Sequence, residues 1–328
     1  MSESNGSKVL TEAVKELGRR HGAALVGVAP IERFDPRPPY HDEAPKGHDP
    51  RDFVPGARSV ISFAMPIMNP VMDAPAVLMD QELELVPPDL KQPYLERLYS
   101  HMGHALQDRM LEHVAHFIGL HLMREGFDSM LFPTTGIHPH RPGGTSTGEE
   151  ELGERQLWNG PSAAWGKIFS PFGHSPGPFS HRHAATRAGL GEFGYNNIVL
   201  TREFGPRQRF NSIITEAELV PDPLIDEPIC LREECRLCLE ACYMGAITMR
   251  DDPEVRDYRS VDHVDVDRIF VDTPTKTDPR LCDQRRLRLP DPPVRGDCVR
   301  ICPVPQERER LPKRLQEIVA GWKKGRAS

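Results

Sequence analysis

The hydrophobic pattern of the first 70 residues predicts a helix followed by two buried strands. Apolar side chains recur at helical spacing over residues 8–21, and Gly22 ends this pattern in the manner of a helix C-cap. Residues 23–29 form an apolar run that stops at Pro30, and residues 59–67 form a second one. Continuous hydrophobicity in the second run favours a strand that is covered on both faces.

The pattern then predicts one long core helix. It extends from about Tyr94 to Glu125, with apolar residues every three to four positions, and Gly126 ends it. A short strand follows over residues 128–133. The order of helix, strand, loop, strand and long helix indicates a mixed fold of the α/β or α+β class.

Five histidines accompany the long helix, at positions 101, 104, 113, 116 and 121. A spacing of three can place two imidazoles on one side of a helix for metal binding. Long helices also carry histidines on their flanks, and we favour that interpretation here. The residues from 134 to 173 change character, and their composition is compatible with either a flexible insertion or the wall of a ligand pocket.

Composition narrows the class of protein. The chain has 328 residues and a formal net charge of -7, so it lacks a general attraction for nucleic acid or anionic lipid. No run of 18 apolar residues occurs, and the polar N-terminus carries neither an apolar signal region nor a twin-arginine pair. We therefore expect a soluble cytoplasmic protein that binds neither membrane nor nucleic acid.

All seven cysteines lie in the C-terminal third of the sequence. They are Cys230, Cys235, Cys238, Cys242, Cys282, Cys298 and Cys302. In two-cluster ferredoxins, three closely spaced cysteines and a distant fourth hold each iron–sulfur cluster. By this rule Cys230, Cys235, Cys238 and Cys302 form one site, and Cys242, Cys282 and Cys298 form a second.

The second site is one thiolate short. Arg295 stands where a fourth cysteine is expected, and arginine has no lone pair to offer a metal. A 4Fe-4S cluster with a non-cysteine ligand, a 3Fe-4S cluster and a labile iron corner all remain open. Zinc sites and disulfides also use cysteine, but the spacing and the absence of an export signal favour iron–sulfur clusters.

A glycine-rich stretch precedes the cysteines. Gly189, Gly191 and Gly194 match the spacing of a dinucleotide-binding loop. A helical run comes before them and an apolar strand after them, which is the reverse of the order that a Rossmann turn requires. We therefore exclude nicotinamide binding through this motif, although the glycines would let the backbone approach another group closely.

The sequence resembles a known superfamily over most of its length. The stretches His183–Gly194, Arg202–Arg207 and Thr215–Leu219, together with the cysteine module, resemble the reductive dehalogenases and their relatives, the epoxyqueuosine reductases. The resemblance implies a nitroreductase-like cobalamin-binding domain over residues 1–220 and a ferredoxin-like domain with two iron–sulfur clusters over residues 221–328. It also implies base-off cobalamin, a small-molecule substrate, and a reduced ferredoxin or flavodoxin-like electron donor.

The resemblance suggests candidate site residues too. Cobalamin contacts are expected from Gly189, Gly191, Gly194, Asn196, Asn197, His181 and His183. Reductive dehalogenases use a tyrosine supported by a basic residue as proton donor, which points to Tyr195 with Arg202. His174 is an alternative donor, because it stands where epoxyqueuosine reductases carry an acidic residue and because its ordinary pKa permits donation near neutrality.

Two departures shape the functional expectation. The chain ends soon after Cys302, without the helical-repeat domain of epoxyqueuosine reductases, and it lacks the leader and the eighth ligand cysteine of respiratory dehalogenases. We therefore expect a cytoplasmic, non-respiratory reductase that cleaves a small organic substrate. An electron-transfer or cobalamin-handling protein without its own substrate is the main alternative, and flavin in place of cobalamin is a weaker one.

Overall fold

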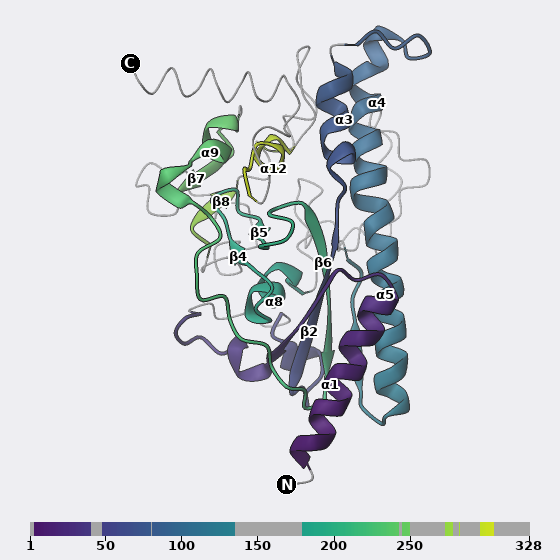
Figure 1. Cartoon of the computed structure of the whole chain (residues 1–328), viewed down its shortest axis with the longest axis vertical. Coiled ribbons are helices and arrows are strands. Elements are labelled where there is room, and N and C mark those ends of the chain that lie inside the picture. Colours follow the sequence, from purple (N-terminus) through teal and green to yellow (C-terminus); the bar gives the residue numbers. More distant parts are fainter. Residues whose placement is uncertain are drawn as a thin grey trace, which may run out of the picture.

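The structure is a computed structural model of the chain (Figure 1). It describes residues 3–40, 48–79, 81–134, 179–242, 245–249, 273–277, 282 and 296–304. The fold contains helices and an antiparallel sheet, which agrees with the mixed class expected from the sequence.

A four-stranded sheet lies at the centre of the molecule. Its strands are β1 (Leu25–Pro30), β2 (Ser59–Pro66), β6 (Gln208–Thr215) and β3 (Ser129–Leu131), in the order β1-β2-β6-β3, and every neighbouring pair is antiparallel. Ile61 pairs with Val28 on one side and with Ile213 on the other. All residues of β2 except Pro66 are buried, as its continuous hydrophobicity predicts.

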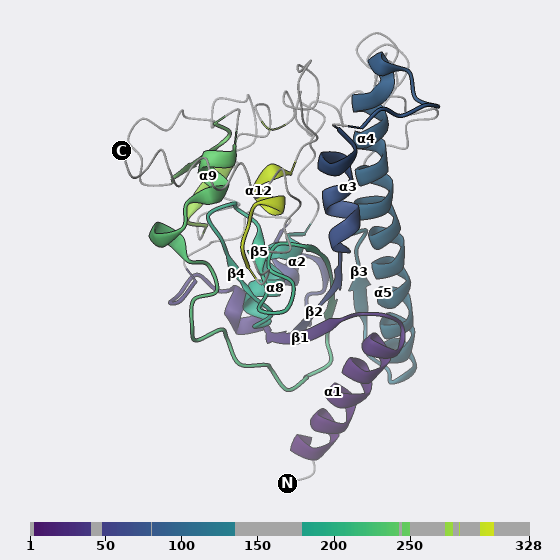
Figure 2. The same cartoon turned by 45° about the horizontal axis from the view of Figure 1, so that its top comes forward.

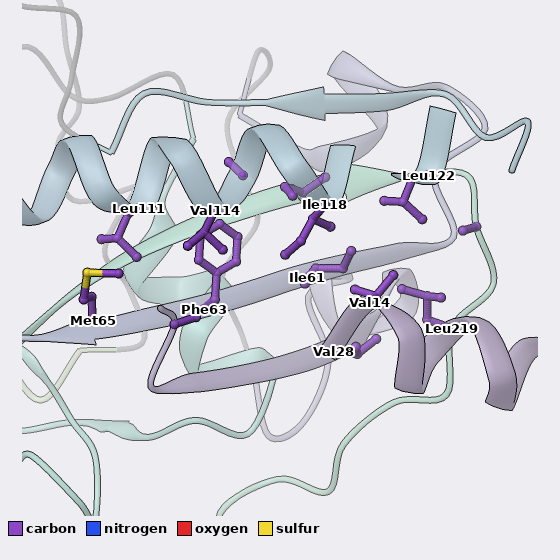
Figure 3. Packing of buried hydrophobic residues seen from close by; sticks show 14 residues of the cluster. Val14, Val28, Ile61, Phe63, Met65, Leu111, Val114, Ile118, Leu122 and Leu219 are labelled. Carbon is purple, nitrogen blue, oxygen red and sulfur yellow. The ribbon is translucent and has the colours of Figure 1, made fainter. Parts of the chain in front are cut away.

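Helices α1 (Glu3–Arg20) and α5 (Leu106–Arg124) cover one face of the sheet. Their apolar side chains meet those of the central strand, with Val114 and Ile118 of α5 lying over Ile61 and Phe63 (Figure 3). The predicted long helix is in fact three consecutive segments: α4 (Lys91–Tyr99), a π-helical stretch (Ser100–Ala105) and α5. A π-helical stretch often marks a functional position in a helix.

Helix α8 (His181–Arg187) covers the opposite face. Small residues allow it to approach closely, because Ala185 packs against Ala64 of β2 in one apolar cluster. At Gly27 of β1, a β-carbon would lie only 2.6 Å from the carbonyl oxygen of Ala188. The sheet is therefore enclosed between α1 and α5 on one side and α8 on the other.

Shorter elements complete the described structure. They are a 3₁₀ turn at Ile31–Phe34, α2 (Pro50–Phe53), α3 (Asn69–Met79), a 3₁₀ turn at Pro88–Leu90, the hairpin of β4 (Glu192–Phe193) and β5 (Val199–Leu200), a 3₁₀ turn at Arg232–Glu234, α9 (Leu237–Ala241), the pair β7 (Ile247–Met249) and β8 (Thr275–Thr277), and α12 (Asp297–Arg300). Helices α9 and α12 lie side by side, far from the start of α1 (Figures 1 and 2). Among the described residues, no helix combines the length and hydrophobicity needed to cross a membrane.

The connection between the sheet and the cysteine module is tied to β1. Asp222 accepts a hydrogen bond from the backbone N–H of Val28 (2.8 Å) and forms an ion pair with Lys15 of α1 (2.6 Å). Arg33 donates to the carbonyl oxygen of the same Asp222 (2.8 Å). The first residues after the predicted boundary at 220 are therefore anchored on the sheet region.

Candidate functional site

Four cysteines surround one cavity at the end of the molecule that carries α9 and α12. They are Cys230, Cys235, Cys238 and Cys302, the four that the sequence assigns to one cluster. Residues of the β4–β5 hairpin and of the connection between its strands line the same cavity, among them Tyr195, Asn196 and Leu200. The cavity thus lies where the cysteine module meets the glycine-rich segment.

Left-handed backbone turns bring these cysteines together. Arg232 and Arg236 have φ angles of 45° and 51°, in the region that side-chain-bearing residues seldom adopt. Such conformations cost about 1–3 kcal/mol each and are concentrated at functional sites. The strain is confined to the turns on either side of Cys235, so the chain bends around this thiol.

A carboxylate of the hairpin holds the first of these cysteines in place. Glu192 of β4 accepts hydrogen bonds from the backbone N–H groups of Ile229 (2.7 Å) and Cys230 (2.6 Å). Its other oxygen forms an ion pair with Arg232 (3.0 Å). The β4 strand therefore orients the segment that carries Cys230.

The remaining cysteines gather around Cys298 of α12. Burial is the largest cause of the raised pKa of Cys298, and the nearby thiols of Cys282, Cys238 and Cys242 raise it further. The structure thus brings together the three cysteines that the sequence assigns to the second cluster. Cys238 lies close to both groups, and Arg295 is outside the described residues.

Thiols of this site have raised pKa values, which a bound cation would lower. Burial raises the pKa of Cys302 to about 12 and also raises that of Cys238, where the thiols of Cys302, Cys230 and Cys235 add to the effect. All seven cysteines are free of disulfides. Iron would reverse this situation, because a coordinated thiol loses its proton outright.

The arrangement of the thiols fits a cluster. Sulfur-rich sets of four are the ligands of iron–sulfur clusters, and here the four thiols border a cavity. Among the residues that the structure describes, no three Cys, His, Asp or Glu side chains are arranged to hold a single metal ion. The donor set and the cavity together fit a multi-iron group.

Tyr195, one of the predicted catalytic residues, faces the cysteine module. Its hydroxyl donates to Glu233 (2.7 Å), and this hydrogen bond is the main cause of its raised pKa. The guanidinium of Arg232 lies 5.9 Å from the centre of its ring. Tyr195 is therefore protonated at neutral pH, and its hydroxyl proton is hydrogen-bonded to the carboxylate of Glu233.

Of the other two catalytic candidates, only Arg202 lies within the described residues. The side chain of Arg202 is 46% exposed and lies 3.6 Å from Asp226 and 3.5 Å from Glu227. Its charge therefore faces acidic residues at the surface, in the segment before the cysteines. His174 lies outside the described residues.

The three glycines that the sequence offers as cofactor contacts make room for the protein chain itself. A β-carbon at Gly189 would lie 1.9 Å from the carbonyl oxygen of Pro223, and one at Gly191 would lie 2.1 Å from that of Leu200. At Gly194 the obstacle is the side chain of Leu200, at 2.4 Å. Packing against the protein chain thus accounts for the missing side chain at each of these positions, while a cofactor contact from them stays a prediction.

The predicted polar contacts lie around the start of α8 and the turn after β4. His183 is buried, with Nδ1 2.7 Å from the hydroxyl of Ser180, and Asn196 caps its own turn by accepting from the N–H of Ile198 (3.1 Å). Asn197 has a φ of 56° and donates through Nδ2 to the hydroxyl of Thr277 (3.2 Å). Its Oδ1 is buried and has no hydrogen-bond partner among the described residues.

His181 has a similarly open atom. Its Nε2 donates to the carbonyl oxygen of Pro133 (3.0 Å), while its Nδ1 is buried without a hydrogen-bond partner among the described residues. Burial lowers the pKa of His181 to about 4, so the ring is neutral at pH 7. Its Nδ1 is then an acceptor that a bound group could use.

Sequence reasoning missed a polar network beside His181. Arg209 of β6 makes two hydrogen bonds to the carboxylate of Asp108 (2.8 and 3.0 Å) and lies 3.4 Å from Nδ1 of His104. Nε2 of His104 lies 3.0 Å from the hydroxyl of Tyr99. The only signal in the sequence was the histidine spacing on the long helix, which we attributed to its flank.

Comparisons with known proteins point in one direction. No family model matches the chain. A tetrachloroethene reductive dehalogenase of Desulfitobacterium hafniense is 43% identical over 74 residues, which is 22% of this chain and 13% of that protein. The chain thus matches only a small part of its curated relatives.

Solved structures extend the likeness to the fold. A reductive dehalogenase whose structure suggests a mechanism for B12-dependent dehalogenation covers 96% of this chain, at a TM-score of 0.53 and 16% identity, and the match spans 36% of that protein. A catabolic reductive dehalogenase in complex with 3-bromo-4-hydroxybenzoic acid covers 95% of this chain and 33% of its own, at a TM-score of 0.53 and 15% identity. An epoxyqueuosine reductase matches at a TM-score of 0.42 and 16% identity, over 73% of this chain and 53% of its own.

All of these proteins are oxidoreductases by name. The fold over most of the chain and the sequence over a short stretch together support placing it in the superfamily of reductive dehalogenases and epoxyqueuosine reductases.

Proposed function

We propose that the protein is an iron–sulfur- and cobalamin-dependent reductase that cleaves a bond in a small organic substrate. The observation that carries this proposal is the set of four thiols around one cavity, with three more cysteines beside it. The proposal includes a nitroreductase-like domain over residues 1–220 and a ferredoxin-like domain over residues 221–328. Electrons would enter from a ferredoxin or flavodoxin-like donor.

Two cluster sites follow from the cysteine groups. Cys230, Cys235, Cys238 and Cys302 would hold the first cluster, a 4Fe-4S cluster. Cys242, Cys282 and Cys298 would hold the second, which is either a 3Fe-4S cluster or a 4Fe-4S cluster with a non-cysteine ligand. Cys238 of the first group and Cys242 of the second both contribute to the raised pKa of Cys298, which supports placing the two proposed clusters next to each other.

Cobalamin would supply the reductive chemistry, since reduced cobalt can attack bonds that protein side chains cannot. Among the described residues, Oδ1 of Asn197 and Nδ1 of His181 are buried polar atoms without a hydrogen-bond partner, and a ligand could use them. A reductive dehalogenase with the same fold, whose structure suggests a mechanism for B12-dependent dehalogenation, supports this assignment. The contacts expected from the glycines at 189, 191 and 194 stay a prediction.

The protein must also deliver a proton when a bond is reduced. Tyr195 keeps its proton at neutral pH, because the hydrogen bond to Glu233 raises its pKa. His181, in contrast, is neutral at that pH, and its one N–H already donates to the carbonyl oxygen of Pro133. Of the candidates within the described residues, Tyr195 therefore fits the role of donor best.

The substrate class is a small organohalide. Tetrachloroethene is named for the relatives by sequence, and a bromo-hydroxybenzoic acid is bound to a protein of the same fold. These names support a halogen leaving group.

An anaerobic reconstitution experiment tests the proposal. Iron, sulfide and cobalamin are added to purified protein, and iron content, electron paramagnetic resonance and cobalt absorbance are recorded before and after reduction. We expect two clusters and one bound cobalamin, followed by halide release from brominated phenols. Zinc at the cysteines, or clusters without cobalamin uptake, would contradict the reductase proposal.

One observation favours a second function. A β-carbon at any of the three glycines of the middle segment would meet protein atoms, so packing alone explains these glycines and they do not by themselves require a cofactor. A protein that holds only iron–sulfur clusters would then act as an electron carrier or cobalamin-handling partner. Clusters that reduce a separate cobalamin protein, without halide release by this chain alone, would support it.

A further inference from the structure

We propose that Arg207 is a positioning residue that raises the reduction potential of the first cluster by holding a buried positive charge beside Cys302. The inference rests on the proposed function, because it concerns a cluster bound by the four thiols. It adds a role for a residue that neither the cysteine pattern nor the comparisons single out.

Arg207 is held rigidly at the start of β6. Its backbone N–H donates to the carbonyl oxygen of Phe204 (3.0 Å), and its own carbonyl oxygen accepts from the N–H of Ile67 (2.8 Å). Its side chain is only 2% exposed and is among the largest fully buried side chains of the described residues. A guanidinium cannot lose its proton in a protein, so this site carries a permanent charge away from water.

The guanidinium reaches across to the cysteine module. One terminal nitrogen donates to the carbonyl oxygen of Arg300 (2.9 Å), in the segment between Cys298 and Cys302. The other donates to the side chain of Asn69 (2.9 Å) and lies 3.5 Å from the carboxylate of Asp73, both on α3. Arg207 therefore links β6 and α3 to the short segment that connects the two groups of cysteines.

The hydrogen bond to Arg300 fixes the position of this charge. The carbonyl oxygen that accepts it lies two residues before Cys302 in the chain, and the guanidinium is shielded from water. The charge of Arg207 therefore lies against the segment that would place Cys302 on the first cluster.

The sign of the expected effect follows from this reasoning. Reduction adds one negative charge to a cluster, and a nearby cation in a poorly hydrated site favours the reduced form. Asp73, the counterion of Arg207, works in the opposite direction. Removing the cation should lower the potential of the first cluster, and neutralising the anion should raise it.

The structure favours tuning over simple stabilisation as the role of this pair. Buried ion pairs often contribute little to stability, because desolvation offsets their attraction. Apolar residues of similar volume would fill the same space at no such cost. A buried cation next to a proposed ligand cysteine is explained more directly by the negative charge that reduction would add to the cluster.

The test is a redox titration of the reconstituted full chain, followed by electron paramagnetic resonance. Arg207→Met removes the charge while keeping the bulk, Arg207→Lys keeps the charge but loses the planar fork, and Asp73→Asn neutralises the counterion. In Arg207→Met we expect the equilibrium constant for one-electron reduction of the first cluster to fall at least tenfold, which is 59 mV. In Arg207→Lys we expect it to stay near the wild-type value, and in Asp73→Asn to rise.

Several outcomes would overturn the inference. One is an unchanged potential in Arg207→Met with both clusters intact. If Arg207→Met takes up no iron, the Asp73→Asn variant decides, since an unchanged potential there leaves Arg207 with a structural role only. Failure of the wild-type protein to bind any cluster would instead refute the proposed function, so the two failures can be told apart.

Discussion

Replacing Gly191 with alanine tests whether the glycine-rich segment is built for protein packing or for a cofactor. The new β-carbon would lie 2.1 Å from the carbonyl oxygen of Leu200 and 2.9 Å from its carbonyl carbon. Contacts below 3.0 Å force neighbouring atoms to move, and these atoms belong to the backbone of β5. The hairpin of β4 and β5 has only two residue pairs, so it cannot absorb the displacement locally.

The expected cost is that of overpacking a well-packed site, about 1–3 kcal/mol. We expect the upper part of this range, because Gly191 and Leu200 are both buried in the computed fold. The assay is urea unfolding of protein prepared without iron or cobalamin, followed by fluorescence. Hydrogen exchange of the Gly194 amide, which donates to the carbonyl of Ile198 (2.9 Å), should speed up in parallel.

Gly6 provides the matched control. It lies in α1, and a β-carbon there meets nothing within 4 Å. Alanine should leave stability unchanged or increase it by up to about 1 kcal/mol, because alanine is the better helix former. If Gly191→Ala instead unfolds like the wild type but takes up less cobalamin, the packing explanation is wrong and the glycine serves a ligand.

Three further predictions follow from the site. Cys302→Ala should lose the first cluster and about half of the bound iron, measured against protein, since one thiolate of four is missing. Asp108→Asn should cost about 2–3 kcal/mol in urea unfolding, because it removes the carboxylate charge opposite the partly buried Arg209, and adding Arg209→Met should recover part of that loss. Burial lowers the folded pKa of His181 to about 4, below its ordinary 6.5, so its contribution to stability is present above pH 6.5 and is lost as the pH falls towards 4. In His181→Gln, the free energy of unfolding of the iron-free protein should therefore fall less between pH 7 and pH 4, by at most about 3 kcal/mol. An unchanged pH dependence of this free energy would show that the His181 ring is hydrated.

The local elements were predictable because their signals are local. Apolar runs located the strands β1, β2 and β3, and the order of helix, glycines and strand by which we excluded a Rossmann turn is present around Gly189. Cysteine spacing also predicted which thiols would gather at one cavity, because the ligand rule for iron–sulfur clusters is expressed in spacing.

Contacts between distant segments were not predictable in this way. Three glycines indicate close approach, but only the fold reveals that Pro223 and Leu200 are what approaches. The long helix was predicted as regular, whereas a π-helical turn at Ser100–Ala105 places His104 near Arg209. Arg207 belongs to a stretch that carries the resemblance, but nothing in its neighbourhood along the chain predicts that its side chain is buried against Arg300.

The four cysteines of the first thiol group are not translated together. Cys230, Cys235 and Cys238 emerge together, while Cys302 follows 64 positions after Cys238. Iron delivered to a nascent chain would find three sulfurs and an open side, exposed to oxygen and to exchange. If these four thiols hold the proposed cluster, its complete ligand set exists only after translation has passed Cys302.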